Sequence, residues 1–267
     1  MDGTFRSGRF VAWGNAVLAG LVSPDTAAER ICGPDCHRVF AFAGQDEESV
    51  TVTLARLRKT GATGLRLVLP VPGDLLGLPG PAEFNLDALE AGEAVLIDGT
   101  FAGTAAWGLI PGLLEENPDD CPGTTVHWQA RPVNASAADL PSLGEAEREL
   151  AETMSAATDA LDALDVARWR PEAADRISEI RAGRAGDILA PGYPQRAHRV
   201  LALAQRVAAI AELASDDDGA AFNINGIAGR DAELRQLARA ARRAQLAAYN
   251  AAAYDSTNGQ GQDARLA

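Results

Sequence analysis

The sequence predicts an N-terminal layer domain of the α+β or α/β class with about four strands, followed by an all-α antiparallel helical bundle. Two patterns support this prediction. Up to residue 134, short apolar runs typical of buried strands alternate with segments whose apolar residues recur at helical spacing. After a polar linker of small residues at 135–141, only helical spacing remains. We therefore expect an α/β domain at residues 1–134, a four-helix bundle at 142–254 and a disordered tail at 255–267.

Helices of the first domain are predicted from their apolar spacing and their end signals. Residues 9–21 carry one apolar face at spacings of three and four. Residues 23–25 predict the start of a second helix, because serine caps, proline suits the first helical position and aspartate faces the positive end of the helix dipole. A third helix is expected at 46–60, ended by Gly61. Asn85 is expected to cap a short fourth helix.

Strands of the first domain are predicted from four apolar runs, at residues 38–43, 65–71, 94–98 and 124–133. The run at 65–71 is the strongest, and Pro70 should lie near its end because proline has no N–H to donate to a β-ladder. The last run alternates between apolar and polar residues, as a half-buried strand does. The order of the strands in the sheet is left open.

The expected bundle begins with a capping box, in which Ser142 and Glu145 each satisfy a free N–H of the other's backbone. Its first helix carries a seam of apolar residues at spacings of three and four, namely Leu150, Met154, Ala157, Leu161 and Leu164. Pro171 and Pro194 are expected to start the second and third helices, and residues 230–252 the fourth. The first helix is acidic and the last is basic, so we expect the two to be neighbours.

Composition excludes several classes of function. A formal net charge of −13 repels phosphate backbones and anionic lipid surfaces, so neither nucleic acid nor membrane is an expected partner. No secretory leader and no apolar stretch of membrane-spanning length is recognisable. The 267 residues can bury a full core without a metal or a disulfide. Three cysteines, an odd number, do not make a disulfide framework and favour a cytoplasmic location.

The first candidate site is the loop rich in glycine and proline at residues 72–83. It leaves the strongest predicted strand at an end where α/β proteins gather ligands. Gly73, Gly77 and Gly80 would let a ligand approach the backbone, and Asp74 could orient a hydroxyl or an amine. The alternative is a rigid packed turn whose leucines are tucked into the core.

The second candidate is a zinc site built from Cys32, Cys36, Cys121 and His127. Thiolates and imidazoles suit zinc, and four such ligands close a tetrahedral site if the two segments are adjacent in the sheet. The alternative is that the cysteines are small buried fillers and the histidine caps a loop. Apart from zinc, no cofactor is predicted.

Two segments carry a resemblance to a known family: residues 61–95 (GATGLRLVLPVPGDLLGLPGPAEFNLDALEAGEAV) and 164–173 (LDVARWRPEA). They resemble a family of uncharacterised actinobacterial proteins, over most of the chain up to about residue 250. The resemblance implies the same two-part organisation. Because the family has no assigned activity, it carries no catalytic residue over to this chain, and its pattern does not include the cysteines or histidines.

The sequence favours a non-catalytic cytoplasmic protein that works by binding. The reason is that few side chains suit acid–base or covalent catalysis. The bundle would be the partner or dimerisation module, and the α/β domain would carry a modest ligand or protein site. The second interpretation is an enzyme acting on a small polar metabolite at loop 72–83, with Asp74 and either Arg66 or Glu83. The third is the zinc protein. A partner protein, self-association or a small molecule thus remain the alternatives for what is bound.

Overall fold

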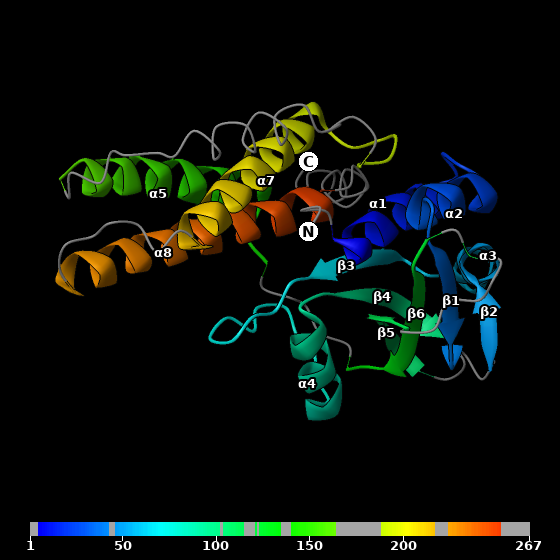
Figure 1. The fold of residues 1–267 in the computed structure, drawn as a ribbon. Coiled ribbons are helices and arrows are strands. Elements are labelled where there is room, and N and C mark those ends of the chain that lie inside the picture. The colour runs from blue at the N-terminus through cyan, green and yellow to red at the C-terminus, as the bar shows by residue number, and fades with distance from the viewer. Residues whose placement is uncertain are drawn as a thin grey trace, which may run out of the picture. The chain divides into compact units, whose positions relative to one another are not determined.

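The structure, a computed structural model, describes residues 5–42, 46–101, 104–114, 121, 123–134, 140–163, 188–216 and 224–251 (Figure 1). The chain divides into two compact units. The sheet unit comprises the described residues from Phe5 to Leu140 together with Ile188–Pro194, and the helical unit holds the long helices of the second half. The short segment Ile188–Pro194 contributes buried Ile188, Leu189, Ala190 and Tyr193.

The sheet has six strands in the order β2-β1-β6-β5-β4-β3. Only β1 and β6 are parallel, and every other neighbouring pair is antiparallel. The strands are β1 (Cys36–Phe40), β2 (Glu47–Ser49), β3 (Gly64–Val68), β4 (Ala94–Phe101), β5 (Thr104–Leu113) and β6 (Thr125–Pro132). The prediction of about four strands was therefore wrong, because the sheet is a mixed six-stranded one.

The sequences of the two unpredicted strands, β2 and β5, lack a clear strand pattern. The segment at β2 was assigned to the following helix, which begins only at Val50, where the Ser49 hydroxyl accepts a hydrogen bond from the N–H of Val52. The segment at β5 contains proline, which disfavours a central strand. In the described sheet the β4–β5 ladder ends at Leu109, so Pro111 pairs with β6 alone and its missing N–H interrupts no bond to β4.

One face of the sheet is covered by helices α1 (Arg6–Leu18), α2 (Pro24–Cys32) and α3 (Val50–Thr60) (Figure 1). Alternate residues of the strands point toward them, and the ring of Phe10 on α1 lies 5.0 Å from that of Trp128 on β6. The start of α2 is the predicted one, since the Ser23 hydroxyl accepts from the N–H of Thr26. Gly61 ends α3 in the left-handed conformation, also as predicted.

The free edge of strand β3 is capped by a side chain of α1. The Asn15 amide donates to the carbonyl of Leu65 over 2.9 Å, and the Leu65 N–H donates to Asn15 Oδ1 over 2.8 Å. The side chain thus takes the place of a neighbouring strand, which protects an edge that could otherwise pair with another chain. This approach requires the preceding glycine, because a Cβ on Gly14 would lie 2.2 Å from a methyl carbon of Leu65.

The opposite face of the sheet is partly covered by α4 (Ala82–Ala91) (Figure 1). Phe84 lies over Gly108, where a Cβ would meet its ring. This second core also includes Val68, Ala88, Ala94, Leu96, Ala106, Ile110 and Val133. Asn85, expected to cap α4, instead lies inside the helix and accepts from the N–H of Gly80.

The helical unit contains α5 (Leu143–Ala163), α7 (Gln195–Asp216) and α8 (Ile224–Asn250). The predicted capping box starts α5, since Glu145 accepts from the Ser142 N–H over 2.9 Å and Ser142 accepts from the Glu145 N–H over 3.3 Å. Helix α8 packs against both α5 and α7. Arg243 on α8 lies 3.6 Å from Glu149 on α5, so the basic and acidic helices are neighbours. None of the helices in the described ranges combines the length and apolarity needed to cross a bilayer.

The predicted four-helix antiparallel bundle is not matched. Three helices are described, and α5 and α7 share few contacts, so α8 lies between two helices that do not pack extensively on each other. The helix expected after Pro171 lies outside the described residues, as does the tail expected at 255–267. The error arose because spacings of three and four predict that a helix has an apolar face, and not which helices that face meets.

Replacing Asn15 tests the closure of β3. We expect Asn15→Ala to lower the free energy of unfolding by about 2–4 kcal/mol, because two buried backbone groups of Leu65 lose their partners. Chemical denaturation measures this loss. The exposed control Leu86→Ala should change stability by no more than about 0.5 kcal/mol. Equal stabilities of the two variants would refute the role given to Asn15.

Candidate functional site

The loop between β3 and α4 begins with a tight turn. The N–H of Val71 donates to the carbonyl of Asp74 over 3.1 Å, and the N–H of Asp74 donates back to the carbonyl of Val71 over 2.9 Å. Gly73 has a φ of 83°, which a turn with proline before it requires and which other residues rarely adopt. The turn therefore has a fixed shape, and the loop extends away from the sheet (Figure 1).

The other predicted glycines anchor the loop. Gly77 has a φ of 88°, and a Cβ there would lie 2.9 Å from Val68 and 3.0 Å from Leu140. Gly80 has a φ of 84°, and a Cβ there would lie 2.8 Å from the side-chain nitrogen of Asn134. Leu78 packs against the core beneath α4. These glycines provide close backbone packing, the role expected of a rigid turn.

The three charged residues proposed for an enzyme site do not form a common cluster in the contacts described below. Asp74 is buried, with 8% of its surface exposed. Arg66 forms a two-pronged contact with Asp98, with N–O distances of 2.7 and 2.8 Å. Glu83 is largely exposed and lies 3.9 Å from Arg131. Two of the three groups thus pair with residues outside the loop, and the enzyme site at this loop stays a prediction.

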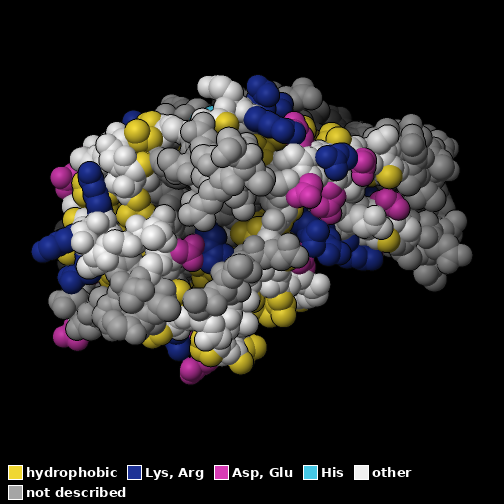
Figure 2. Space-filling model, turned by 180° about the vertical axis from the view of Figure 1, so that it is seen from behind, with side chains coloured by type: hydrophobic (Ala, Val, Ile, Leu, Met, Phe, Trp, Pro, Cys, Tyr) yellow, Lys and Arg dark blue, Asp and Glu magenta, His cyan; other side chains and the backbone are white. Residues whose placement is uncertain are grey.

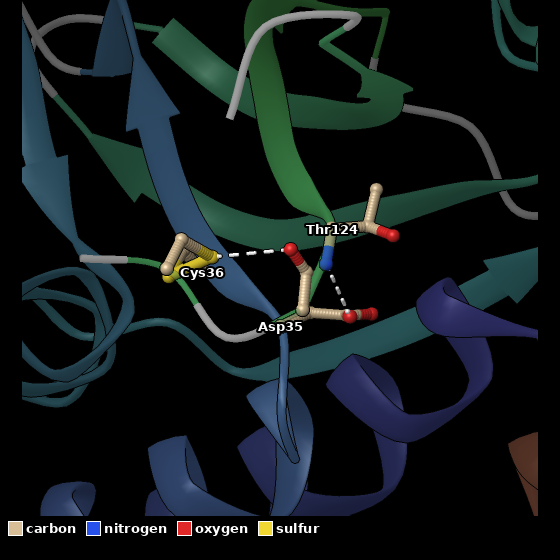
Figure 3. The surroundings of a disulfide bond; sticks show 5 residues. Asp35, Cys36 and Thr124 are labelled. Atoms are coloured by element: carbon tan, nitrogen blue, oxygen red, sulfur yellow. Dashed lines mark hydrogen bonds between the residues drawn. A yellow bond between two sulfur atoms is a disulfide. The ribbon is translucent and has the colours of Figure 1, made fainter. Parts of the chain in front are cut away.

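The cysteines of the second candidate are placed by the parallel pairing of β1 with β6. Cys36 begins β1 and forms a disulfide with Cys121, 85 residues further along the chain (Figure 3). The N–H of Cys36 donates to the carbonyl of Thr124, and the N–H of Thr124 donates to the carboxylate of Asp35 over 2.9 Å. This disulfide was not predicted, because three cysteines, an odd number, indicated no disulfide framework and favoured a reducing cytoplasm.

The third cysteine remains a thiol. Cys32 ends α2, and burial raises the pKa of its thiol to about 11, although the backbone N–H of His37 donates toward the sulfur and opposes that shift. His127 precedes Trp128 on β6 and therefore points to the opposite face of the sheet from that residue, against Gly112, where a Cβ would meet its ring. Within the described ranges, no three groups from His, Cys, Asp and Glu gather where they could hold a metal ion.

His37 is a buried neutral imidazole. Its Nδ1 accepts a hydrogen bond from the indole N–H of Trp128 over 3.2 Å, so the proton of the neutral ring resides on Nε2. Burial lowers the pKa of His37 from 6.5 to about 4, and Arg6 and Arg9 act in the same direction against Asp35. His37 therefore acts as a hydrogen-bond acceptor in the core and is not protonated at neutral pH.

Sequence reasoning missed a contact that fixes the start of α1. The carboxylate of Glu93, in the turn before β4, accepts from the N–H of Ser7 over 2.8 Å. Glu93 thus supplies the cap that the residue before the helix, Phe5, does not provide. Burial raises the pKa of Glu93, and its hydrogen bonds from Ser7 limit the shift. Only the missing cap at the start of α1 could have suggested such a partner.

Comparison with known proteins identifies the family. The model for the N-terminal domain of Rv1486c-like proteins matches residues 7–142, and the model for their C-terminal domain matches residues 144–246. The chain belongs to the Rv1486c-like family. The resemblance seen in residues 61–95 and 164–173 is confirmed, since the matched relatives come from mycobacteria, which are actinobacteria.

Three relatives illustrate the similarity. "Uncharacterized protein Rv1486c" of Mycobacterium tuberculosis strain H37Rv is 30% identical, over 74% of this chain and 78% of that protein. "Uncharacterized protein ML1804" of Mycobacterium leprae is 26% identical, over 90% of this chain and 94% of that protein. "Uncharacterized protein MAV321" of Mycobacterium avium is 35% identical over 40% of this chain and 42% of that protein. No solved structure matches the chain significantly. The family provides no assigned activity.

The buried His37 predicts a loss of stability in acid. The unfolded chain takes up a proton at this residue below about pH 6.5, but the folded chain does so only near pH 4. Stability should therefore fall as pH drops through that window, by about 3 kcal/mol in total. Urea unfolding of the wild type and of His37→Gln, with the disulfide intact in both, isolates the effect. Identical pH dependence in the two proteins would contradict it.

The disulfide predicts that protein prepared without reductant holds no stoichiometric zinc, because zinc binds thiolates and a disulfide supplies none. Elemental analysis after dialysis measures the metal content. One zinc per chain, lost in both Cys36→Ser and His127→Ala, would instead support the zinc site predicted from the sequence.

Proposed function

We propose that this protein acts by binding a protein partner, and that the loop of residues 72–81 is a docking site on its sheet unit. The observation that supports this most directly is an exposed apolar tip on a loop of fixed shape. Leu75 is 53% exposed, although the neighbouring Asp74 is buried and Leu78 is packed in the core. Exposed apolar side chains on a rigid loop bind at a smaller entropic cost than mobile ones.

The fixed shape has three sources. The hydrogen bonds between Val71 and Asp74 fix the turn that precedes Leu75. Gly77 lies against Val68 and Leu140, where no larger residue fits. At the far end, the N–H of Gly80 donates to Asn85 Oδ1 and its carbonyl accepts from the N–H of Asn134. A loop without its own helix or strand that is held in this way is typical of binding loops.

The state of several ionisable groups supports a binding role and argues against a catalytic role. Arg66 is paired with Asp98, and Glu48 is paired with Arg56 while it accepts from Thr53. The pKa values of His37 and Cys32 are shifted away from neutrality, in the direction that makes each unreactive. On the face shown in Figure 2, basic and acidic side chains are interleaved. This arrangement favours another protein as the binding partner over a polyanion such as a nucleic acid.

Helices α5, α7 and α8 were expected to carry a partner or to dimerise. No contact among the described residues bears on that role, which we propose as secondary to the loop. A small polar metabolite near Asp74 is the competing proposal for the same loop. A thermal-shift screen with metabolites separates the two, because only the metabolite proposal expects stabilisation by a small molecule.

The test compares two single substitutions of exposed leucines. Leu75→Asp should weaken partner binding about tenfold or more, since it places a charge at the apolar tip, with little effect on thermal stability. Leu21→Asp is the matched control, because Leu21 is 50% exposed and lies after α1. Tagged full-length proteins are crosslinked in a lysate of the source organism, and recovered partners are then titrated against each purified variant.

A partner that binds the wild type and Leu21→Asp but not Leu75→Asp supports the docking loop. Gel filtration of the purified chain reveals whether that partner is a second copy. Equal binding by all three proteins would show that the loop is not the docking site.

A further inference from the structure

We propose that Cys36 and Cys121 form a reversible disulfide that locks the segment before β6 to the start of β1, so that the protein responds to the thiol redox state around it. The two cysteines are joined in the structure although 85 residues separate them. This inference is independent of the docking loop. It concerns the parallel pair β1 and β6, which lies across the sheet from β3, the edge strand that leads into the loop.

The first step is that the two sulfurs are held together by more than their own bond. The N–H of Cys36 donates to the Thr124 carbonyl over 3.0 Å, and the N–H of Thr124 donates to Asp35 over 2.9 Å. Gly123 fits against Pro34 and Asp35 so closely that a Cβ would lie 2.5 Å from the Pro34 carbonyl oxygen. These contacts do not need the disulfide, so the reduced thiols remain close and can form the bond again.

The second step is that the unit does not require a disulfide to fold. Its two cores, one on each face of the sheet, bury Phe10, Trp128, Leu54, Ile97 and Phe84 almost completely. A domain of this size with such cores is stable without a crosslink, which small secreted domains often need. A bond that is dispensable for folding can be made and broken in the folded state.

The third step is access and selectivity. Cys36 and Cys121 are both partly exposed, so a small thiol can reach the bond. Cys32, four residues before Cys36, is the one other cysteine of the chain. Its raised pKa keeps it protonated at neutral pH, so it is a poor nucleophile for the neighbouring disulfide. Exchange is thereby confined to one pair, with an external thiol as the reactant.

The chemistry balances with a small-molecule disulfide as oxidant. One thiolate of the pair attacks that disulfide to form a mixed disulfide and releases one small thiol. The second protein thiolate attacks the protein sulfur, forms the Cys36–Cys121 bond and releases the second small thiol. The protein loses two electrons and two protons, and the oxidant gains them. Reduction by two small thiols is the reverse of this sequence.

The test follows the pairing in full-length protein equilibrated in mixtures of reduced and oxidised glutathione. Samples are quenched in acid, alkylated under denaturing conditions and cleaved before aspartate, which separates Cys32 from Cys36 because Asp35 lies between them. Mass spectrometry should find a Cys36–Cys121 crosslink whose fraction rises and falls with the glutathione ratio. Cys32 should be alkylated throughout, and Cys32→Ser should behave as the wild type.

Three results would overturn the proposal: a crosslink that involves Cys32, crosslinks between chains, or a Cys36–Cys121 pair that stays formed or stays absent at every ratio. Thermal unfolding provides the second measurement. Dithiothreitol should lower the melting temperature of the wild type by about 5–10 °C, because the closed loop is long. Dialysis against oxidised glutathione should restore it.

The Cys36→Ser, Cys121→Ser double variant should melt like the reduced wild type and ignore dithiothreitol. If that variant does not fold, the melting temperatures of the reduced and reoxidised wild type still test the proposal. A wild type whose crosslink is broken without any change in melting temperature would refute the lock.

Discussion

The parallel pairing of β1 with β6 is the constraint on which the sheet unit depends. It joins the first predicted strand to the last, across most of the unit, and places β1 between β2 and β6. Because the pair is parallel, residues 36 and 125 lie side by side at the same end of the two strands. The disulfide, the buried contact of His37 with Trp128 and the packing of Phe10 on Trp128 all follow from this pairing.

The sheet unit presents two different environments, one beside the parallel pair β1 and β6 and one after the edge strand β3. At the start of β1 and β6, hydrogen bonds and close packing hold a disulfide together, and the ionisable groups nearby have pKa values shifted by burial. Beyond β3, a loop of fixed shape exposes an apolar side chain. We propose that the first environment responds to the thiol redox state and that the second contacts a protein partner. The two environments involve different residues, so a substitution in one can leave the other unchanged.

Much of the local structure could be predicted, and the reasons are local. Ser23 caps α2 by accepting from an N–H three residues on, and Ser142 and Glu145 form their box within a single turn. The short strand β2 and the proline-containing β5 could not be predicted, since their pairing partners stabilise them more than their own residues do. The predicted bundle failed for a similar reason, because an apolar helix face does not specify its neighbour.

The sequence by itself determined the family, the start of α2, the end of α3, the capping box of α5 and the loop of residues 72–81, because these depend on residues close together in the chain. Tertiary structure alone decided the order of the strands, the closure of β3 by Asn15 and the union of Cys36 with Cys121. The identity of an asparagine or a cysteine in the sequence does not say which distant residue its side chain will meet. Its role is fixed only when the fold brings a distant partner within bonding distance.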